Sequence, residues 1–222
     1  MYAVFFLGVM MFRFGLVGKM GSGKTTLGNM LIENFCGKRI AFADKLKEDI
    51  LHFHFTEDGK IEKPRDRALM QAYGQLRRGE LRTVDFYNGR VDNIDGSCYI
   101  ARIERTGTKV MHSSEYVGEC LSNHWVEQLI QKASALQNNI IVDDIRRNNE
   151  STALCENNFV IIKIDCSVEE RLRRLTARDG SFDPKTLTDI SETEVDEIKY
   201  DYVVDNNNSD IKFAFEELIK LI

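Results

Sequence analysis

Apolar residues along the chain fall into two kinds of stretch that alternate with each other. Short continuous apolar runs predict buried strands, and they lie at residues 12–17, 39–42, 139–145, 159–165 and 202–204. Between these runs, apolar residues recur three and four positions apart, which predicts helices. This alternation is typical of an α/β fold. We therefore expect a three-layer sandwich in which helices cover both faces of a mostly parallel five-stranded sheet.

Residues 80–116 interrupt the alternation of strands and helices. Asn88 and Gly89 form a turn dipeptide, and residues 99–105 alternate apolar and polar side chains as a half-exposed strand does. We expect an inserted β-hairpin element in this part of the chain.

Residues 1–10 form an apolar segment before the first predicted strand. No positively charged region precedes the segment, no small-residue cleavage site follows it, and it is too short to cross a bilayer. We therefore expect an N-terminal extension at residues 1–10 and a single domain at residues 11–222.

Charge and cysteine content restrict the kinds of partner. The formal net charge of the 222 residues is -5, so no overall positive field attracts nucleic acid or an anionic membrane, and neither is an expected partner. The five cysteines are odd in number and irregularly spaced, which favours reduced thiols and a cytoplasmic location. Cys120 and His124 have no second pair at ligand spacing, so no zinc site is expected.

One stretch has a specific chemistry. Residues 18–25, GKMGSGKT, match the phosphate-binding loop (P-loop) pattern G-x-x-x-x-G-K-[ST], with a predicted strand before them and a predicted helix after them. The glycines let backbone N–H groups approach phosphate oxygens, Lys24 supplies a positive charge, and the Thr25 hydroxyl is suited to ligate Mg²⁺. The residues expected to contact ATP here are Gly18, Lys19, Met20, Gly21, Ser22, Gly23, Lys24, Thr25 and Thr26.

Two carboxylates lie near the ends of predicted strands. The run at 139–145 closes with Asp144, where phosphate-loop enzymes place a carboxylate that orients Mg²⁺ or the acceptor. Asp44 opens the helix that follows the run at 39–42. It is either a structural helix cap or a cleft residue that holds a substrate hydroxyl or a metal-bound water, and the sequence leaves both interpretations open.

Two predicted helices carry several arginines each. The helix at 65–78 combines arginines with Gln71 and Gln75, whose amides suit base edges while guanidinium groups suit a monophosphate. The helix after Ser167 carries arginines at positions 171, 173, 174 and 178. Each set is either a solvated face or part of a binding site. Beside a phosphate loop, the second set favours a mobile helical lid at about 168–192.

Several stretches together carry a family resemblance: GKMGSGKTT, FADKLK, VDDIRRNNE and SETEVDEIKYDYVVDNNNS, with ALMQAYGQLRR and His124-Trp125-Val126 as weaker support. On these residues the chain resembles the P-loop nucleoside monophosphate kinases, and among them the deoxynucleoside monophosphate kinases of phages and large DNA viruses. The resemblance implies Mg²⁺-dependent transfer of the γ-phosphoryl group of ATP to a (deoxy)nucleoside 5′-monophosphate.

The resemblance also implies roles for residues outside the loop. It gives catalytic roles to Lys24, Asp144, Arg146, Arg171 and Arg174, with the last two at the lid. It places Asn206 and Asn208 near the ATP base. It gives the acceptor site to Asp44, Arg67, Gln71, Gln75 and Arg77, with the monophosphate at Arg67 and Arg77 and with Asp144 and Arg146 on the acceptor side.

Other functions share these features. Dephospho-CoA kinase and phosphomevalonate-type kinases have the same architecture and a similar loop, and a non-catalytic nucleotide-binding regulatory module is the alternative from another class. A GTPase is disfavoured because the chain has no Asn-Lys-x-Asp motif, and a nucleic-acid 5′-kinase because it has no basic track. The expected partners are small-molecule nucleotides. The oligomeric state is left open, with a homodimer as one alternative.

Overall fold

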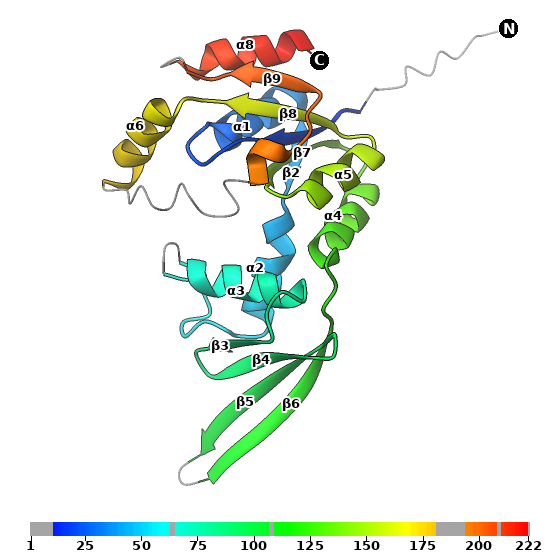
Figure 1. Cartoon of the computed structure of the whole chain (residues 1–222), viewed down its shortest axis with the longest axis vertical. Coiled ribbons are helices and arrows are strands. Elements are labelled where there is room, and N and C mark those ends of the chain that lie inside the picture. Colours follow the sequence, from blue (N-terminus) through cyan, green and yellow to red (C-terminus); the bar gives the residue numbers. More distant parts are fainter. Residues whose placement is uncertain (1–10, 63–64, 107–108, 181–193, 208–209, 222) are drawn as a thin grey trace, which may run out of the picture. The chain divides into compact units, whose positions relative to one another are not determined.

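The computed structural model describes residues 11–62, 65–106, 109–180, 194–207 and 210–221. The chain forms two compact units (Figure 1). The first contains the chain up to Ala41 and from Ile130 onward, and the second contains Phe42–Leu129. The predicted extension at residues 1–10 and residues 181–192 of the predicted lid lie outside the described residues.

The first unit is built on a parallel sheet of five strands. These are β1 (Arg13–Val17), β2 (Gly37–Ile40), β7 (Asn139–Ile145), β8 (Val160–Asp165) and β9 (Tyr202–Asp205). Their order is β2-β7-β1-β8-β9, and each neighbouring pair is parallel. The predicted five-stranded parallel sheet is confirmed.

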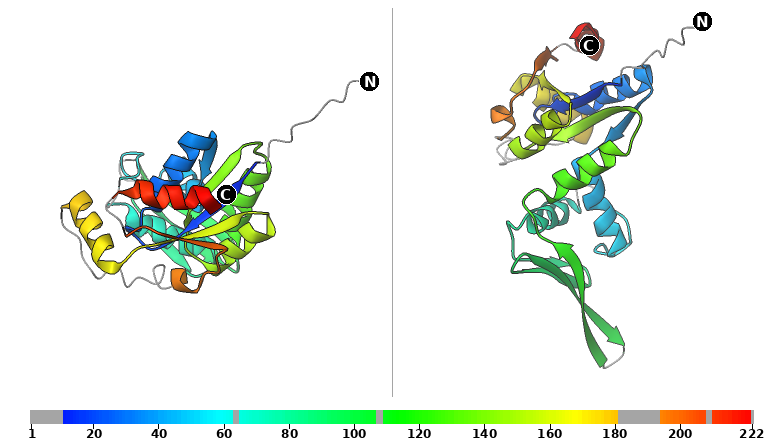
Figure 2. Two further views of the ribbon diagram at one scale, coloured as in Figure 1. Left: turned by 90° about the horizontal axis from the view of Figure 1, so that it is seen from above. Right: turned by 90° about the vertical axis from the view of Figure 1, so that its right-hand side faces the viewer.

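Helices cover both faces of this sheet (Figures 1 and 2). They are α1 (Lys24–Phe35) and α8 (Ile211–Leu221) on one face and α5 (Asn148–Glu156) with a short 3-10 helix η2 (Glu194–Glu197) on the other. Helix α6 (Val168–Asp179) follows β8 and extends beyond its end. On one face Leu16 of β1 packs in a core with Leu27 of α1 and Leu218 of α8. On the other face a Cβ added to Gly15 would lie 3.4 Å from Leu154 of α5. Because successive strand residues face opposite sides, the buried strands have a helical layer on each side.

The second unit combines helices with an antiparallel sheet. Its helices are α2 (Phe42–His52) and α3 (Arg67–Arg77), and its sheet has the order β3-β4-β5-β6. These strands are β3 (Thr83–Phe86), β4 (Gly89–Ile94), β5 (Ser97–Thr106) and β6 (Lys109–Glu119). Helix α3 packs on β3 and β4. The expected β-hairpin element is present, since β3 and β4 pair across the turn before Gly89. The insert is larger than this hairpin, because β5 and β6 extend it to a four-stranded sheet.

Two further elements differ from the expectations or extend them. The strand expected at 39–42 lies two residues earlier, and Phe42 already begins α2, where it shares a buried helical face with Leu46 and Ile50. The boundary between the two units falls within α4 (His124–Ser134). No helix in the described ranges combines the length and the hydropathy needed to span a membrane.

The expectation of five reduced cysteines is wrong for one pair. Cys98 at the start of β5 and Cys120 just after β6 form a disulfide, with their Cα atoms 6.1 Å apart. The strand register explains this pairing, because Cys98 lies opposite Gly118 and the Cys120 N–H donates to the Gly96 carbonyl at 2.7 Å. Cys36, Cys155 and Cys166 are free thiols. The cytoplasmic location, which rested partly on reduced thiols, stays a prediction.

Candidate active site

The phosphate-binding loop connects β1 to α1 in the first unit. Gly21 and Gly23 have positive φ angles of 81° and 97°, a conformation that residues with a Cβ rarely adopt. A Cβ at Gly21 would lie 3.0 Å from the Arg171 carbonyl oxygen, and a Cβ at Gly23 would collide with the side-chain nitrogen of Asn206. The loop therefore requires glycine at both positions, for its backbone conformation and for its close packing.

Lys24 and Ser22 lie buried within this loop. The Lys24 ammonium donates to the main-chain carbonyls of Gly18 and, at 3.0 Å, Lys19. The Ser22 side chain is 1% exposed, and its Oγ has no hydrogen-bond partner among the described residues. The loop thus holds an ammonium group and a buried hydroxyl close to its own backbone.

The N-terminus of α1 supplies further groups that suit phosphate. No capping side chain hydrogen-bonds to the first main-chain N–H groups of this helix. Thr25 and Thr26 are exposed in its first turn. Main-chain N–H groups at a helix N-terminus, an ammonium group and a threonine hydroxyl form the donor set that fits a triphosphate with Mg²⁺.

Asn206, which follows β9, is hydrogen-bonded to the phosphate-binding loop. Its side chain is 0% exposed, and its Nδ2 donates to the Ser22 carbonyl at 2.7 Å. Its own carbonyl accepts from Arg174 Nη2 at 2.9 Å, and its N–H donates to Asp165 at 2.8 Å. Asn206 therefore links β8, α6 and the loop. Its expected place near the ATP base stays a prediction, and Asn208 lies outside the described residues.

Helix α6 turns some of its arginines toward the loop and others toward solvent. Arg171 is 3% exposed and donates from Nε to the Met20 carbonyl at 2.8 Å. The Arg174 side chain is 21% exposed and pairs with Glu170 at 2.7 Å, whereas the Arg173 side chain is 60% exposed and pairs with the same carboxylate at 2.6 Å. The Arg173 and Arg174 guanidinium groups hold the pKa of Glu170 at about 2. Arg171 and Arg174 thus contact the loop and its support, and the lid role stays a prediction.

A pocket of about 250 Å³ lies beside the loop in the same unit. Lys19, Ser22 and Arg171 line one part of it, and Asp196 of η2 lines another. The Lys19 ammonium forms an ion pair with Asp196 at 2.7 Å. This ion pair connects the loop to η2, a contact that the sequence pattern does not reveal.

Strand β7 ends with two neighbouring carboxylates, at the point where its register against β1 shifts. Asp143 is buried and forms an ion pair with Arg39 Nε at 2.7 Å. Asp144 is half-buried, as is Arg146 just beyond the strand end. Asp143 thus pairs with Arg39, and the role of Asp144 as an orienting carboxylate stays a prediction.

Four of the five predicted acceptor residues lie on α3, where they separate into two groups, and the fifth lies on α2. Arg67, Gln71 and Gln75 are spaced by four residues, so they share one helical face, and none of the three is fully buried. The Arg67 guanidinium has no hydrogen bond or ion pair among the described residues. Arg77 lies on the buried face instead, and Asp44 is half-buried in the first turn of α2. Both interpretations of Asp44 stay open.

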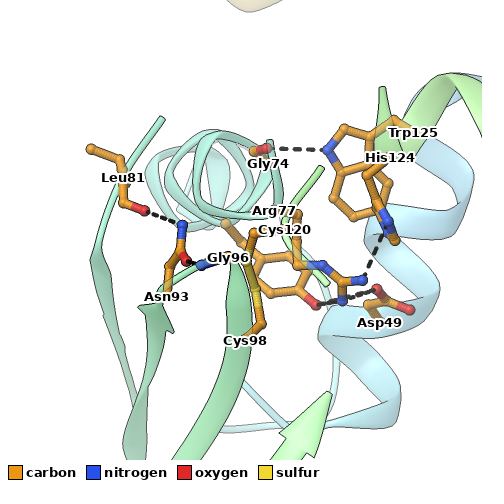
Figure 3. The surroundings of a disulfide bond; sticks show 11 residues. Asp49, Gly74, Arg77, Leu81, Asn93, Gly96, Cys98, Cys120, His124 and Trp125 are labelled. Atoms are coloured by element: carbon orange, nitrogen blue, oxygen red, sulfur yellow. Dashed lines mark hydrogen bonds and ion pairs between the residues drawn. A yellow bond between two sulfur atoms is a disulfide. The ribbon is translucent and has the colours of Figure 1, made fainter. Parts of the chain in front are cut away.

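Arg77 belongs to a buried polar cluster near the disulfide (Figure 3). Its side chain is 5% exposed and lies 3.5 Å from Asp49, while its Nη1 donates to the Tyr73 hydroxyl at 3.1 Å. Its Nη2 lies 3.4 Å from His124 Nδ1. Burial lowers the pKa of His124 to about 4, with the Arg77 charge contributing, and burial raises the pKa of Tyr73. The expected contact of Arg77 with a monophosphate stays a prediction.

Comparison with known proteins assigns this site to a family. A family described as AAA domain, AAA_18, matches residues 15–199. The chain belongs to the AAA_18 family. It is also 23% identical over 215 residues to a dephospho-CoA kinase of Corynebacterium glutamicum, a match that covers 96% of each chain.

Solved structures share the fold of this AAA_18 member. A shikimate kinase of Acinetobacter baumannii is similar with a TM-score of 0.53 and 13% identity, covering 96% of this chain and 93% of that one. The TT1252 protein of Thermus thermophilus is similar with a TM-score of 0.52 and 15% identity, covering 95% of each. At these identities the likeness shows the fold alone, which is that of a P-loop kinase with an added antiparallel sheet. Together the family and the loop support a P-loop phosphotransferase that acts on small molecules.

Proposed function

We propose that this AAA_18 member transfers the γ-phosphoryl group of ATP to a small acceptor that carries a nucleobase. The single observation that carries the proposal is the conformation of the loop between β1 and α1. Two of its glycines have positive φ angles, its lysine is buried, and the side chains of Asn206 and Arg171 donate hydrogen bonds to its carbonyls. A loop held in this way presents main-chain N–H groups to phosphates at little reorganisation cost.

The chemistry in this proposal rests on positioning and charge. Lys24 and the N–H groups at the start of α1 would hold the triphosphate, and Thr25 would be the protein ligand of Mg²⁺, whose charge offsets that of the phosphates. Asp144 would orient the metal or the acceptor, and Arg146, Arg171 and Arg174 would stabilise charge on the transferred group. No nucleophilic side chain is needed, because the acceptor oxygen is itself the nucleophile.

The motifs favour a (deoxy)nucleoside 5′-monophosphate as the acceptor, with product diphosphate. Arg67 supports this proposal, because its guanidinium has no ion-pair partner among the described residues and a guanidinium fork suits a phosphate. Dephospho-CoA is the second candidate, and the similarity to the Corynebacterium glutamicum enzyme over nearly the whole chain favours it more than the first. Both candidates carry a nucleobase.

A screen of acceptors tests the proposal. ADP release from ATP would be measured with the common ribo- and deoxynucleoside monophosphates, dephospho-CoA, phosphomevalonate and shikimate. We expect turnover that depends on one nucleobase-bearing acceptor and on Mg²⁺. Turnover with phosphomevalonate or shikimate alone would contradict the acceptor class. No turnover with any acceptor, despite ATP binding, would favour the non-catalytic module.

A further inference from the structure

A second pocket lies wholly within the second unit and has a composition unlike that of the phosphate loop. Its volume is about 280 Å³, and it is lined by segments around Phe55, α3 and the turn after β3. The lining residues are Phe55, Thr56, Glu57, Arg65, Asp66, Leu69, Asp85, Phe86 and Tyr87. A volume of this order suits a single aromatic ring system.

Aromatic side chains form one part of this pocket. Phe55 is 1% exposed, and its ring lies 4.2 Å from that of Phe86, so the Phe86 ring is held by a buried neighbour. Tyr87 is 64% exposed, and its main-chain N–H donates to the Phe55 carbonyl at 3.4 Å. The pocket therefore offers an anchored ring and an exposed ring, and planar bases stack on such side chains.

The charge of the lining disfavours a phosphate group. Three carboxylates and one guanidinium line the pocket, and that guanidinium is already engaged, since Arg65 Nη2 lies 3.0 Å from Asp66 and 3.1 Å from Asp58. The carboxylates of Glu57 and Asp85 have no hydrogen bond or ion pair among the described residues. Two carboxylates without partners repel an anion and attract N–H donors.

Thr56 adds a buried hydrogen-bonding group. Its side chain is 6% exposed, and its hydroxyl has no partner in the part of the chain that the structure describes. A buried hydroxyl that lacks a partner costs free energy, so a ligand in the adjoining pocket that reaches it would gain from the contact. This observation is independent of the carboxylates and points to the same pocket.

We propose that this pocket binds a nucleobase that carries an exocyclic amino group, with Tyr87 and Phe86 against the ring and Glu57 and Asp85 accepting its N–H groups. Adenine, cytosine and guanine each have such donors, whereas uracil and thymine present carbonyl oxygens beside a single N–H. The inference rests on the proposed function, because it names the part of the acceptor that the second unit recognises. Arg67, the proposed phosphate contact, begins α3 directly after the pocket residue Asp66 and does not itself line the pocket.

Binding of nucleosides, which lack phosphate, tests this inference without any turnover. Calorimetry with the full chain would compare adenosine, guanosine and cytidine with uridine and thymidine. We expect one or more of the first three to bind at least tenfold more tightly than the last two, since lost carboxylate contacts of this kind cost about 1.4 kcal/mol or more. Equal binding of both groups, or no nucleoside binding, would overturn the proposal.

Matched variants locate the binding to the pocket. Tyr87→Ala should weaken the best nucleoside at least fivefold, whereas Tyr116→Ala, which removes another tyrosine that is 56% exposed, should leave binding unchanged. Asp85→Asn should reduce the preference for amino-bearing bases, whereas Glu119→Gln, an exposed carboxylate on β6, should not. Equal effects within either pair would overturn the assignment to this pocket.

The two proposals fail in different ways. The base pocket is wrong, and the kinase proposal stands, if the acceptor screen shows turnover but the nucleosides do not bind. The same holds if the nucleosides bind and Tyr87→Ala does not weaken their binding. If amino-bearing nucleosides bind with the expected variant effects but no acceptor is phosphorylated, the base pocket stands and the kinase proposal is wrong.

Discussion

Replacement of Asn206 by alanine tests whether the phosphate-binding loop is held in place by the chain after β9. The Asn206 side chain is fully buried, and its amide is a direct link from this segment to the loop through the Ser22 carbonyl at 2.7 Å. Asn206→Ala removes the donor and leaves the buried Ser22 carbonyl without it. It also removes side-chain volume from beneath Gly23, which lies in contact with the amide.

The structure sets the size of the expected effect. An unsatisfied buried carbonyl costs about 1–3 kcal/mol, so we expect Asn206→Ala to lower the free energy of unfolding by about 2 kcal/mol. The loop would also lose part of its fixed conformation before ATP arrives. If ordering the loop on binding costs about 1.4 kcal/mol, the affinity for ATP is tenfold weaker.

Urea unfolding and calorimetric titration with ATP measure the two effects, and Asn157→Ala is the matched control. The Asn157 amide also donates to a main-chain carbonyl, that of Ala153 at 2.8 Å, but it is half-buried at the end of α5. We expect the control to lose less than about 1 kcal/mol and to bind ATP normally. Equal losses in the two variants, or unchanged ATP affinity in Asn206→Ala, would refute the assigned role.

Three further predictions follow from the site and its surroundings. The pKa of His124 is lowered to about 4 from 6.5, so its contribution to stability is fully present above pH 6.5 and is lost as the pH falls toward 4. Allowing for partial exposure, we expect the free energy of unfolding to fall by about 2 kcal/mol over this range. Urea unfolding of His124→Gln should not show this fall. Asp144→Asn should lower kcat at least a hundredfold with less than about 1 kcal/mol change in stability, whereas equal kcat would leave Asp144 without a catalytic role. Arg174→Ala should lower kcat more than it weakens ATP binding. Arg173→Ala removes the other guanidinium that pairs with Glu170 and should leave kcat and KM unchanged. Equal effects of the two variants on kcat would exclude a specific role for Arg174.

The parallel sheet could be predicted because its signals are local. The apolar runs at 139–145 and 159–165 mark strands that are buried on both faces, and the glycines at 21 and 23 mark a loop whose backbone only glycine adopts easily. Such signals do not depend on distant parts of the chain. The fold class and the position of the phosphate-binding loop therefore follow from the sequence alone.

The insert and the disulfide depend on register, which the sequence does not state. Cys98 and Cys120 pair because β5 and β6 align Cys98 with Gly118, and 22 residues of separation do not reveal that alignment. The same holds for the number of strands, since the Asn88-Gly89 turn and residues 99–105 indicate β3 to β5, whereas β6 is recognised by its pairing with β5.

The contacts that hold the phosphate-binding loop could not be predicted from the sequence for a related reason. Asn206 is 184 residues from its partner Ser22, and Asp196 is 177 residues from Lys19. A buried asparagine between polar neighbours in sequence resembles any turn residue. Asp143 and Asp144 illustrate the same limit, because only the structure shows that Arg39 takes up the first of the two carboxylates.

Phosphorus NMR of the reaction mixture tests the central claim most directly. The wild-type chain and Lys24→Ala would each be incubated with ATP, Mg²⁺ and the best acceptor from the screen, with circular dichroism to confirm that both are folded. We predict that the wild type forms ADP and a new phosphorylated acceptor in equal amounts, and that Lys24→Ala forms almost none because the charge beside the outer phosphates is lost. Formation of the phosphorylated acceptor by a folded Lys24→Ala variant at a rate within a few-fold of the wild type would contradict the account.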